Sequence, residues 1–359
     1  MGRRLLVGAQ DAMNIGLYVV KRLALMVPTL FGVLLLTFVV VQFVPGGPVE
    51  QMVAQLRSHR GEAAGGLAYR GRQGLGPRQL AEIRRLYGFD RPPAQRFVLM
   101  VERFARFDLG RSYYYHASVW KLIRERMPVS ISLGLWNVLL TYLISIPLGI
   151  AKAVRDGSRF DLASSIAVLV GYAIPGFVLG VALLVLFAGG GFWHWFPLRG
   201  LTSDGFSSFT PWHKVTDYLW HVTLPVLAML AGSFAVITML TKNAFLEEMR
   251  KQYVLTARAK GAGEARVLWH HVLRNALIPL VTGFPGAFIG AFFSGALLIE
   301  TLFSLPGLGL LSYESLMRRD YPVVMGTLYL FTLIGLLTKL VSDLCYVWVD
   351  PRVQFESMR

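Results

Sequence analysis

The stretch RKQYVLTARAKGAGEARVLWHHVLRNALIP, residues Arg250–Pro279, decides how the rest of the chain is interpreted. It is basic, glycines interrupt it, and apolar runs long enough to cross a bilayer flank it. Because glycine adopts backbone conformations that other residues resist, Gly261 and Gly263 predict a hinge between two short helices. We expect its cationic side chains to face water and to dock something outside this chain: Arg250, Lys251, Arg258, Lys260, Arg266 and Arg274.

Composition indicates a membrane protein. Of 359 residues, 54% are hydrophobic and 13% are aromatic, more than a soluble domain of this length carries. The formal net charge of +15 lies on the loops, which suits anionic headgroups or acidic partners better than nucleic acid. Cys345 is the single cysteine, which excludes an intrachain disulfide framework and a cysteine-based metal cluster.

Apolar windows of about 20 residues predict an all-α membrane protein with about six transmembrane helices. The expected spans are residues 23–44, 129–151, 162–188, 219–240, 276–299 and 323–349. Prolines inside the spans predict kinks, and recurring glycines predict close packing between helices. The prolines are Pro147, Pro175, Pro225 and Pro285, and the glycines are Gly171, Gly176, Gly180, Gly283, Gly286, Gly290 and Gly295.

Positive charge in the short loops predicts the orientation. The N-terminal segment 1–22, the loop 152–161, the basic loop 241–275 and the tail 350–359 are expected in the cytoplasm, with loops 45–128, 189–218 and 300–322 outside. The first outer loop is too long for its arginines to count against this orientation. Helix-like pieces at 76–89 and 92–107 predict a small folded cap, the second with Phe97, Met100, Val101 and Phe104 at helical spacing.

Motifs for chemistry are missing from the sequence. It contains no phosphate-binding G-x-x-x-x-G-K-[ST] loop, no H-E-x-x-H zinc motif and no G-x-S-x-G elbow. His270 and His271 are adjacent, so on a helix they point in different directions and do not jointly hold a metal. We therefore expect no catalytic residue, no cofactor-binding residue and no metal site in this chain.

Four charged residues lie in or near the expected spans: Lys242, Glu300, Lys339 and Asp343. Charge in hydrocarbon is costly, so each is a functional candidate, although snorkelling at a helix end explains most of them. An ion-coupled secondary transporter that uses Glu300, Lys339 and Asp343 as relays is therefore an alternative function. An intramembrane hydrolase is a weaker one, because no nucleophile and base pair is evident.

The basic loop fits the pattern Y-V-x-x-A-R-A-K-G followed by H-x-L-R-N-A-x-x-P. The matching residues are Tyr253, Val254, Ala257, Arg258, Ala259, Lys260, Gly261, His271, Leu273, Arg274, Asn275, Ala276 and Pro279. The pattern resembles the cytoplasmic EAA loop of binding-protein-dependent ABC importer permeases of the dipeptide and oligopeptide branch. The stretches VPGGPV at 44–49, LPGLGLL at 305–311, RDYPVVMGTLY at 319–329 and SDLCYVWVDPR at 342–352 agree. The resemblance covers almost the whole chain outside residues 1–12.

Within that branch, YRGRQGLGP at 69–77, FPLRGLTS at 196–203 and TKNAFLEEMRKQY at 241–253 look most similar to the Yej-type permeases of peptide and microcin C uptake. The chain departs from the wider family at Leu255, where a glutamate is usual, and at Arg274, which follows Leu273 in place of proline. The peptide branch shares both changes. Lys339 replaces the asparagine usual in that branch.

The resemblance implies the type I ABC importer permease fold in a bacterial inner membrane, with both termini cytoplasmic. It implies a permease subunit that is not itself an enzyme and that forms half of a pore for short peptides or peptide-like compounds. The implied partners are a second homologous permease, one or two cytoplasmic ATPase subunits that bind ATP and Mg²⁺, and an extracytoplasmic peptide-binding protein.

The resemblance also implies that the loop couples the pore to the ATPase. The coupling residues would be Tyr253, Ala257, Arg258, Ala259, Lys260, Gly261, Arg266, His271, Arg274 and Asn275. The short helix after Gly261 would sit in a cleft on the ATPase. Arg258, Lys260 and Arg266 would pair with acidic groups there and supply orientation more than net affinity.

Overall fold

A computed structural model describes residues 2–43, 90–189, 192–293 and 297–349. Within these ranges the chain consists of helices joined by turns, without a β-sheet, so the all-α prediction is confirmed. The VPGGPV stretch, the helix predicted at 76–89 and the tail 350–359 lie outside the described residues, as does Gly295.

Four helices within the described ranges are long and apolar enough to cross a membrane, or up to six if each of two bent pairs counts as one span. The four are residues Gly16–Phe43 of α1 (Gly2–Phe43), α5 (Val119–Val154), α8 (Pro211–Met249) and residues Tyr321–Tyr346 of α15 (Tyr321–Val349). The bent pairs are α6 (Arg159–Ala173) with α7 (Gly176–Phe187), and Glu264–Ala276 with Ile278–Gly290.

The span expected at 162–188 is broken in the middle. Helices α6 and α7 meet at 93°, with Ile174 in an extended conformation and Pro175 capping α7. Proline has no N–H to donate and disfavours the helical conformation of the residue before it. Pro175 therefore ends α6 outright, where the sequence predicted only a kink.

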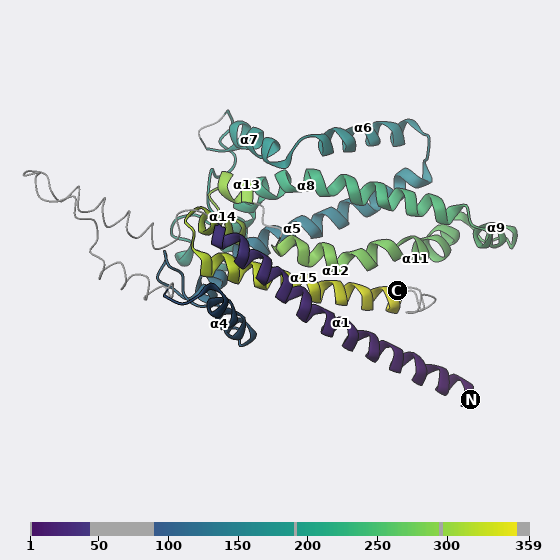
Figure 1. The fold of residues 1–359 in the computed structure, drawn as a ribbon. Helices are drawn as coiled ribbons and strands as arrows, with labels where there is room; N and C mark the ends of the chain where they lie inside the picture. The colour runs from purple at the N-terminus through teal and green to yellow at the C-terminus, as the bar shows by residue number, and fades with distance from the viewer. Residues whose placement is uncertain (1, 44–89, 190–191, 294–296, 350–359) are drawn as a thin grey trace, which may run out of the picture. The chain divides into compact units, whose positions relative to one another are not determined.

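The chain divides into two compact units, which are described separately. The first comprises Met1–Val20, Arg126–Leu311 and Ile334–Arg359. In it α6 and α7 pack against α8, and α13 (Leu297–Leu302) packs against α7 (Figure 1). Its main core joins α5, α8 and the end of α13 and contains Val129, Leu133, Val222, Leu224, Val226, Ala228, Ile299, Phe303 and Leu305.

The second unit comprises Lys21–Glu125 and Ser312–Leu333. It contains α4 (Pro93–Ala105), with Phe97 and Phe104 buried, so the helix predicted from that spacing is confirmed. The Phe97 ring lies 5.4 Å from that of Phe31 and 5.3 Å from that of Phe38. Near the start of α15, the buried carboxylate of Asp320 accepts hydrogen bonds from Ser112 Oγ and from the Tyr113 backbone N–H.

Apolar side chains cover the outer faces of the candidate spans. Only 11% of the most apolar window of α1 is buried, and Leu17, Leu36 and Phe43 are each more than two-thirds exposed at 69%, 67% and 81%. Exposed apolar surface of this extent is stable where lipid or a further subunit covers it. Trp193 and Trp195 stack on each other with ring centroids 5.5 Å apart.

The glycines predicted to pack helices together behave in two ways. A Cβ at Gly180 would lie 2.8 Å from Leu302 Cδ2, and one at Gly176 would lie 2.8 Å from the Ala228 carbonyl oxygen, so close packing is confirmed there. In α12 (Ile278–Phe293), a Cβ at Gly283, Gly286 or Gly290 would meet nothing within 4 Å. That glycine face therefore packs on nothing within the described part of this chain.

Candidate functional site: the basic loop after α8

The basic loop folds as a compact body on the ends of two long helices. It contains α9 (Gln252–Ala259), α10 (Glu264–Arg266), the π-helical segment η2 (Val267–Val272) and α11 (Leu273–Ala276). Its buried residues Val254, Val267, Val272 and Ala276 share a hydrophobic core with Ala153 of α5 and Phe245 of α8. Because all six side chains are at most 1% exposed, the loop is anchored to both helices.

Helix α9 ends in a Schellman motif at Gly261. The Gly261 N–H donates to the Arg258 carbonyl (2.9 Å), and the Ala262 N–H donates to the Ala257 carbonyl (3.2 Å). The motif places its glycine in the left-handed region, and Gly261 has a φ of +81°. The predicted hinge is confirmed, but Gly263 has a φ of −64°, which any residue adopts, so the turn depends on Gly261.

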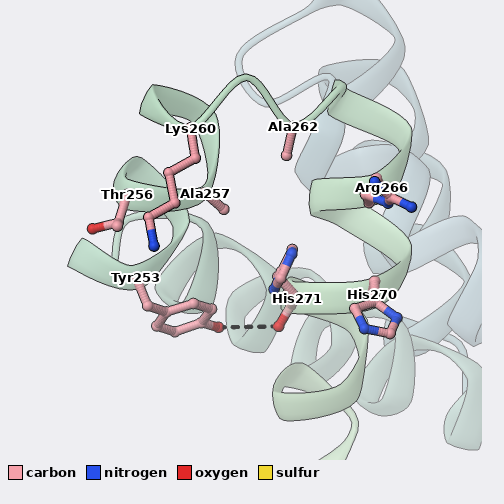
Figure 2. A pocket seen from close by; sticks show the side chains of 8 residues that line it. All are labelled: Tyr253, Thr256, Ala257, Lys260, Ala262, Arg266, His270 and His271. Atoms are coloured by element: carbon pink, nitrogen blue, oxygen red, sulfur yellow. Dashed lines mark hydrogen bonds between the residues drawn. The ribbon is translucent and has the colours of Figure 1, made fainter.

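The Tyr253 hydroxyl links three parts of the loop. It donates to Glu248 Oε2 (2.5 Å) and accepts from Asn275 Nδ2 (3.0 Å). It also lies 3.3 Å from the His271 carbonyl oxygen, the contact that the dashed line in Figure 2 marks. Burial and the Glu248 carboxylate raise the pKa of Tyr253, so the phenol keeps its proton and stays a donor near neutral pH. Lys251 donates to the other oxygen of Glu248, and this bond raises the pKa of Lys251.

Arg258 crosses the Gly261 turn to pair with Glu264. Its Nε lies 2.8 Å from Oε1 and its Nη2 lies 3.1 Å from Oε2. This two-point geometry ties α9 to α10 and neutralises the Arg258 charge within the loop. Both side chains are partly exposed, so the pair fixes geometry more than it adds stability.

An open cleft of about 590 Å³ lies between α9 and the helical segment that follows the turn (Figure 2). Five of the ten predicted coupling residues line it: Tyr253, Ala257, Lys260, Arg266 and His271. Of the others, Gly261 makes the turn and Asn275 binds Tyr253. Arg258, Ala259 and Arg274 are exposed and do not line the cleft.

Three further residues line the cleft but were not among the predicted ones: Thr256, Ala262 and His270. Helical spacing identifies two of them. Thr256 follows Tyr253 by three positions and precedes Lys260 by four, which places the three on one face of α9. His270 follows Arg266 by four positions in the same way.

An ionic cluster of Lys152, Asp156, Asp161 and Lys242 joins the ends of α5, α6 and α8. The Lys152 side chain is 0% exposed, and its Nζ lies 3.2 Å from Asp161 Oδ1. Lys242 Nζ bridges Asp161 Oδ2 (2.6 Å) and Asp156 Oδ1 (2.9 Å). Lys152 Nζ also donates to the Asp161 carbonyl, Ser164 Oγ and Ser165 Oγ.

The ionic cluster adjoins the core that anchors the basic loop. Lys152 precedes Ala153 in α5, and Lys242 lies three residues before Phe245 in α8. Lys242, predicted as a functional candidate because of its charge, therefore has two acidic partners inside the chain. The sequence offered no signal for this cluster, because Lys242 and Asp161 are 81 positions apart.

The carboxylate of Glu300, a predicted functional charge, is occupied by structural bonds. Glu300 is 0% exposed, and its Oε1 accepts from Ser130 Oγ (3.0 Å) while Oε2 accepts from the Leu310 N–H (2.7 Å). Ser130 Oγ in turn accepts from the Leu308 N–H (2.8 Å). These bonds fasten the first turn of α14 (Leu308–Met317) to α5.

The other proposed relay residues have separate surroundings. Asp343 Oδ2 accepts a hydrogen bond from Tyr18 Oη (2.8 Å), and Lys339 is exposed. Glu300 is bonded to Ser130 and Leu310, whereas Asp343 is bonded to Tyr18.

Residues 145–355 match the family described as binding-protein-dependent transport system inner membrane component, and the chain belongs to this family. It is therefore a transport permease of an inner membrane, and the ion-coupled alternative has no support from the family. The chain is 51% identical to the peptidoglycan transport system permease protein YejB of Agrobacterium fabrum (strain C58 / ATCC 33970), over 95% of this chain and 99% of that protein. It is 52% identical to the inner membrane ABC transporter permease protein YejB of Escherichia coli O157:H7, over 95% of this chain and 100% of that protein. It is 33% identical to the di/tripeptide transport system permease protein DppB of Pseudomonas aeruginosa (strain UCBPP-PA14), over 94% and 99% of the two chains.

Proposed function

We propose that this chain is the permease subunit of an ATP-driven importer for short peptides or peptide-like compounds. It forms half of the translocation pore beside a second homologous permease and carries no catalytic activity of its own. One or two cytoplasmic ATPase subunits bind ATP and Mg²⁺, and an extracytoplasmic binding protein delivers the cargo. The family description and the relatives' names support this function, because they denote permeases of binding-protein-dependent, ABC and peptide transport.

The proposed coupling role rests on the observation that the basic loop is anchored to two long helices. The Schellman turn, the Tyr253 bonds and the shared core make the loop one body with the ends of α5 and α8. A force that the ATPase applies to such a body passes directly to two membrane-spanning helices. Nucleotide-dependent contacts then bias an inward-facing against an outward-facing arrangement of the pore.

Replacing Gly261 with valine tests the coupling role. A β-branched residue resists a φ of +81°, so Gly261→Val is expected to distort the turn and abolish uptake while the chain still inserts in the membrane. The matched control is Gly263→Ala, since Gly263 has an ordinary φ of −64° and free space around its Cα. Uptake of labelled tripeptide by cells that express the complete importer is the measurement. Normal uptake by Gly261→Val would count against the coupling role.

The energy source and cargo are tested with the same cells. Uptake should stop on ATP depletion and survive a proton uncoupler that leaves ATP intact; the reverse would favour ion coupling. The relatives' names cover peptidoglycan and di/tripeptides, whose shared chemistry is a short peptide. We expect unlabelled tripeptides and peptide-bearing peptidoglycan fragments to compete with labelled tripeptide, and free amino acids and sugars not to compete.

A further inference from the structure

Helix α4 packs against two candidate spans at some distance from their ends. Its Phe97 ring lies 5.4 Å from that of Phe31 and 5.3 Å from that of Phe38, both in α1. Its Phe104 ring lies 5.2 Å from that of Tyr329 in α15. Phe31 and Phe38 precede the end of α1 by twelve and five positions, or roughly 18 and 8 Å, and Tyr329 lies roughly 12 Å into α15. Helix α4 therefore lies at the depth of one membrane leaflet.

The two flanks of α4 differ in chemistry. Consecutive residues of a helix are rotated by roughly 100°, so Arg96 and Val98 project from opposite sides of the buried Phe97. Arg103 follows Arg96 by seven positions, about two turns, and therefore shares its flank. Val98 is 64% exposed on the other flank. One flank of α4 is thus cationic, and the other is apolar.

The contacts of Arg96 show which flank faces the membrane surface. Its Nη2 donates to Gln42 Oε1 (2.6 Å), and Gln42 is one position from the end of α1. The neighbouring Phe97 ring contacts Phe31, which is eleven positions deeper in the same span. The cationic flank of α4 therefore points toward the end of α1, and the apolar flank points toward the middle of the span. Long cationic side chains at a membrane boundary extend toward water in this way.

The start of α5 adds an aromatic and cationic surface to the same compact unit. Trp120 is 41% exposed, and its Nε1 donates to the Phe107 carbonyl just beyond α4 (2.7 Å). Arg124 is exposed and follows Trp120 by four positions, so both lie on one face of α5. Tryptophan is typical of the boundary between membrane and water. Within the described part of the chain, neither Arg103 nor Arg124 pairs with an acidic side chain, so both can bind an external anion.

The separation of charged from apolar surface favours lipid over a protein as the partner of α4. A protein interface has an apolar centre inside a polar rim. Helix α4 instead has cations on one flank and an exposed valine on the opposite one, as a helix at the boundary between headgroups and hydrocarbon does. Beside the Phe38 contact, α1 also exposes Leu36 and Val40, at 67% and 53%. The surface around α4 at this depth is therefore apolar, as lipid requires.

We propose that α4 lies in the interfacial region of one leaflet, where Arg103 of α4 and Arg124 of α5 bind the phosphate groups of an anionic phospholipid such as phosphatidylglycerol. In the proposed topology this is the outer leaflet. Helix α4 then fixes the depth of α1 and α15 in the membrane, because its aromatic side chains pack on both. The lipid contact is independent of the cargo and of the energy source.

Fluorescence quenching in the complete importer tests the depth of α4. In a Cys345→Ser background, Val98→Cys is labelled with a small fluorophore in detergent, and the importer is then placed in lipid nanodiscs. We expect lipids that carry a nitroxide on the upper acyl chain to quench the label, and iodide in the water to quench it weakly. Ser207→Cys, at an exposed position in loop 189–218, is the matched control and should show the opposite pattern.

The same label measures the preference for anionic lipid. Trace nitroxide-labelled phosphatidylglycerol should quench the Val98→Cys label at a lower mole fraction than phosphatidylcholine with the same nitroxide. Each arginine beside an anionic headgroup contributes roughly fivefold, so Arg103→Gln with Arg124→Gln should remove most of this preference, and added salt should weaken it. The matched control is Glu102→Gln with Arg106→Gln, which removes an ion pair of 2.7 Å from α4 without changing the net charge. That variant should keep the preference.

Three results would overturn the lipid proposal. Quenching of the Val98→Cys label by iodide but not by lipid would mean that α4 stands in water. A label shielded from both quenchers would mean that another protein subunit covers α4. Equal quenching by the two labelled lipids, unchanged by the double arginine variant, would mean that no anionic headgroup is bound. ATP-dependent uptake by the unmodified importer is compatible with each of these results, so the proposed function would stand.

Discussion

Glu300 and Gly307 show at the residue scale how a buried charge is held in this permease. Glu300 accepts from Ser130 Oγ and the Leu310 N–H, which replace the water lost on burial. The carboxylate fits against the chain because Gly307 has no side chain: a Cβ there would lie 2.2 Å from Glu300 Oε1. A carboxylate held in this way has a structural role, because a residue that relays charge must be free to exchange its bonding partners.

Gly307→Ala should therefore destabilise the protein. The added methyl group forces Glu300 or the loop to move, and overpacking of this kind costs about 1–3 kcal/mol. The midpoint of thermal unfolding in detergent is the measurement. Gly171→Ala is the control, because a Cβ at Gly171 meets nothing within 4 Å, and its midpoint should be unchanged or higher. Equal midpoints for the two variants would mean that the Glu300 site is loosely packed.

The ionic cluster holds whole helices together, because it fastens the ends of α5, α6 and α8 to one another beside the anchored loop. Buried ion pairs contribute little net stability over apolar replacements, but removing one partner strands the other. Lys152 has a fully buried side chain, so it depends on Asp161 most. Lys242 keeps Asp156, which is 41% exposed, if Asp161 is lost.

The predicted order of stability follows from this asymmetry. Asp161→Asn leaves the Lys152 ammonium without its counter-charge and should cost about 3–5 kcal/mol. Adding Lys152→Met should recover much of that loss, because an apolar side chain needs no partner. Lys242→Met alone should cost less than Asp161→Asn. Thermal unfolding of the four proteins in detergent measures this, and a double variant less stable than Asp161→Asn would contradict the account.

Elements that depend on local preferences could be predicted from the sequence. The Gly261 turn and helix α4 follow from glycine chemistry and from helical spacing. The break at Pro175 was predicted as a kink, since proline disrupts a helix locally while neighbouring helices set the size of the bend. The ionic cluster was missed, because Lys242 and Asp161 are 81 positions apart and meet only after their helices pack together. The Tyr253–Glu248 bond was missed for another reason: it crosses the break between α8 and α9, where helical spacing does not apply.

At the scale of the whole molecule, the proposed topology makes loop 241–275 cytoplasmic and loop 189–218 extracytoplasmic. Its basis is the distribution of lysine and arginine in short loops. Cys345 is the single cysteine, so Cys345→Ser gives a chain on which one new cysteine can be labelled at a time.

We expect Ser207→Cys in that background to react with a membrane-impermeant maleimide in intact cells with a permeabilised outer membrane. Ala265→Cys should react only after the inner membrane is opened. Both positions are exposed, so accessibility within the chain does not limit labelling. The opposite pattern would invert the topology and remove the loop from the compartment of the ATPase.

The π-helical segment Val267–Val272 sets how the residues after it are rotated about the helix axis relative to the residues before it. A π-turn contains one residue more than the α-helical turn it replaces, and such segments are uncommon outside functional sites. If the segment closed as an α-helix by losing one residue, everything from Leu273 onward would rotate by roughly 100° relative to the cleft. The residues that line the cleft and the polar contacts of Asn275 therefore keep their present relative orientation only while the segment keeps its extra residue.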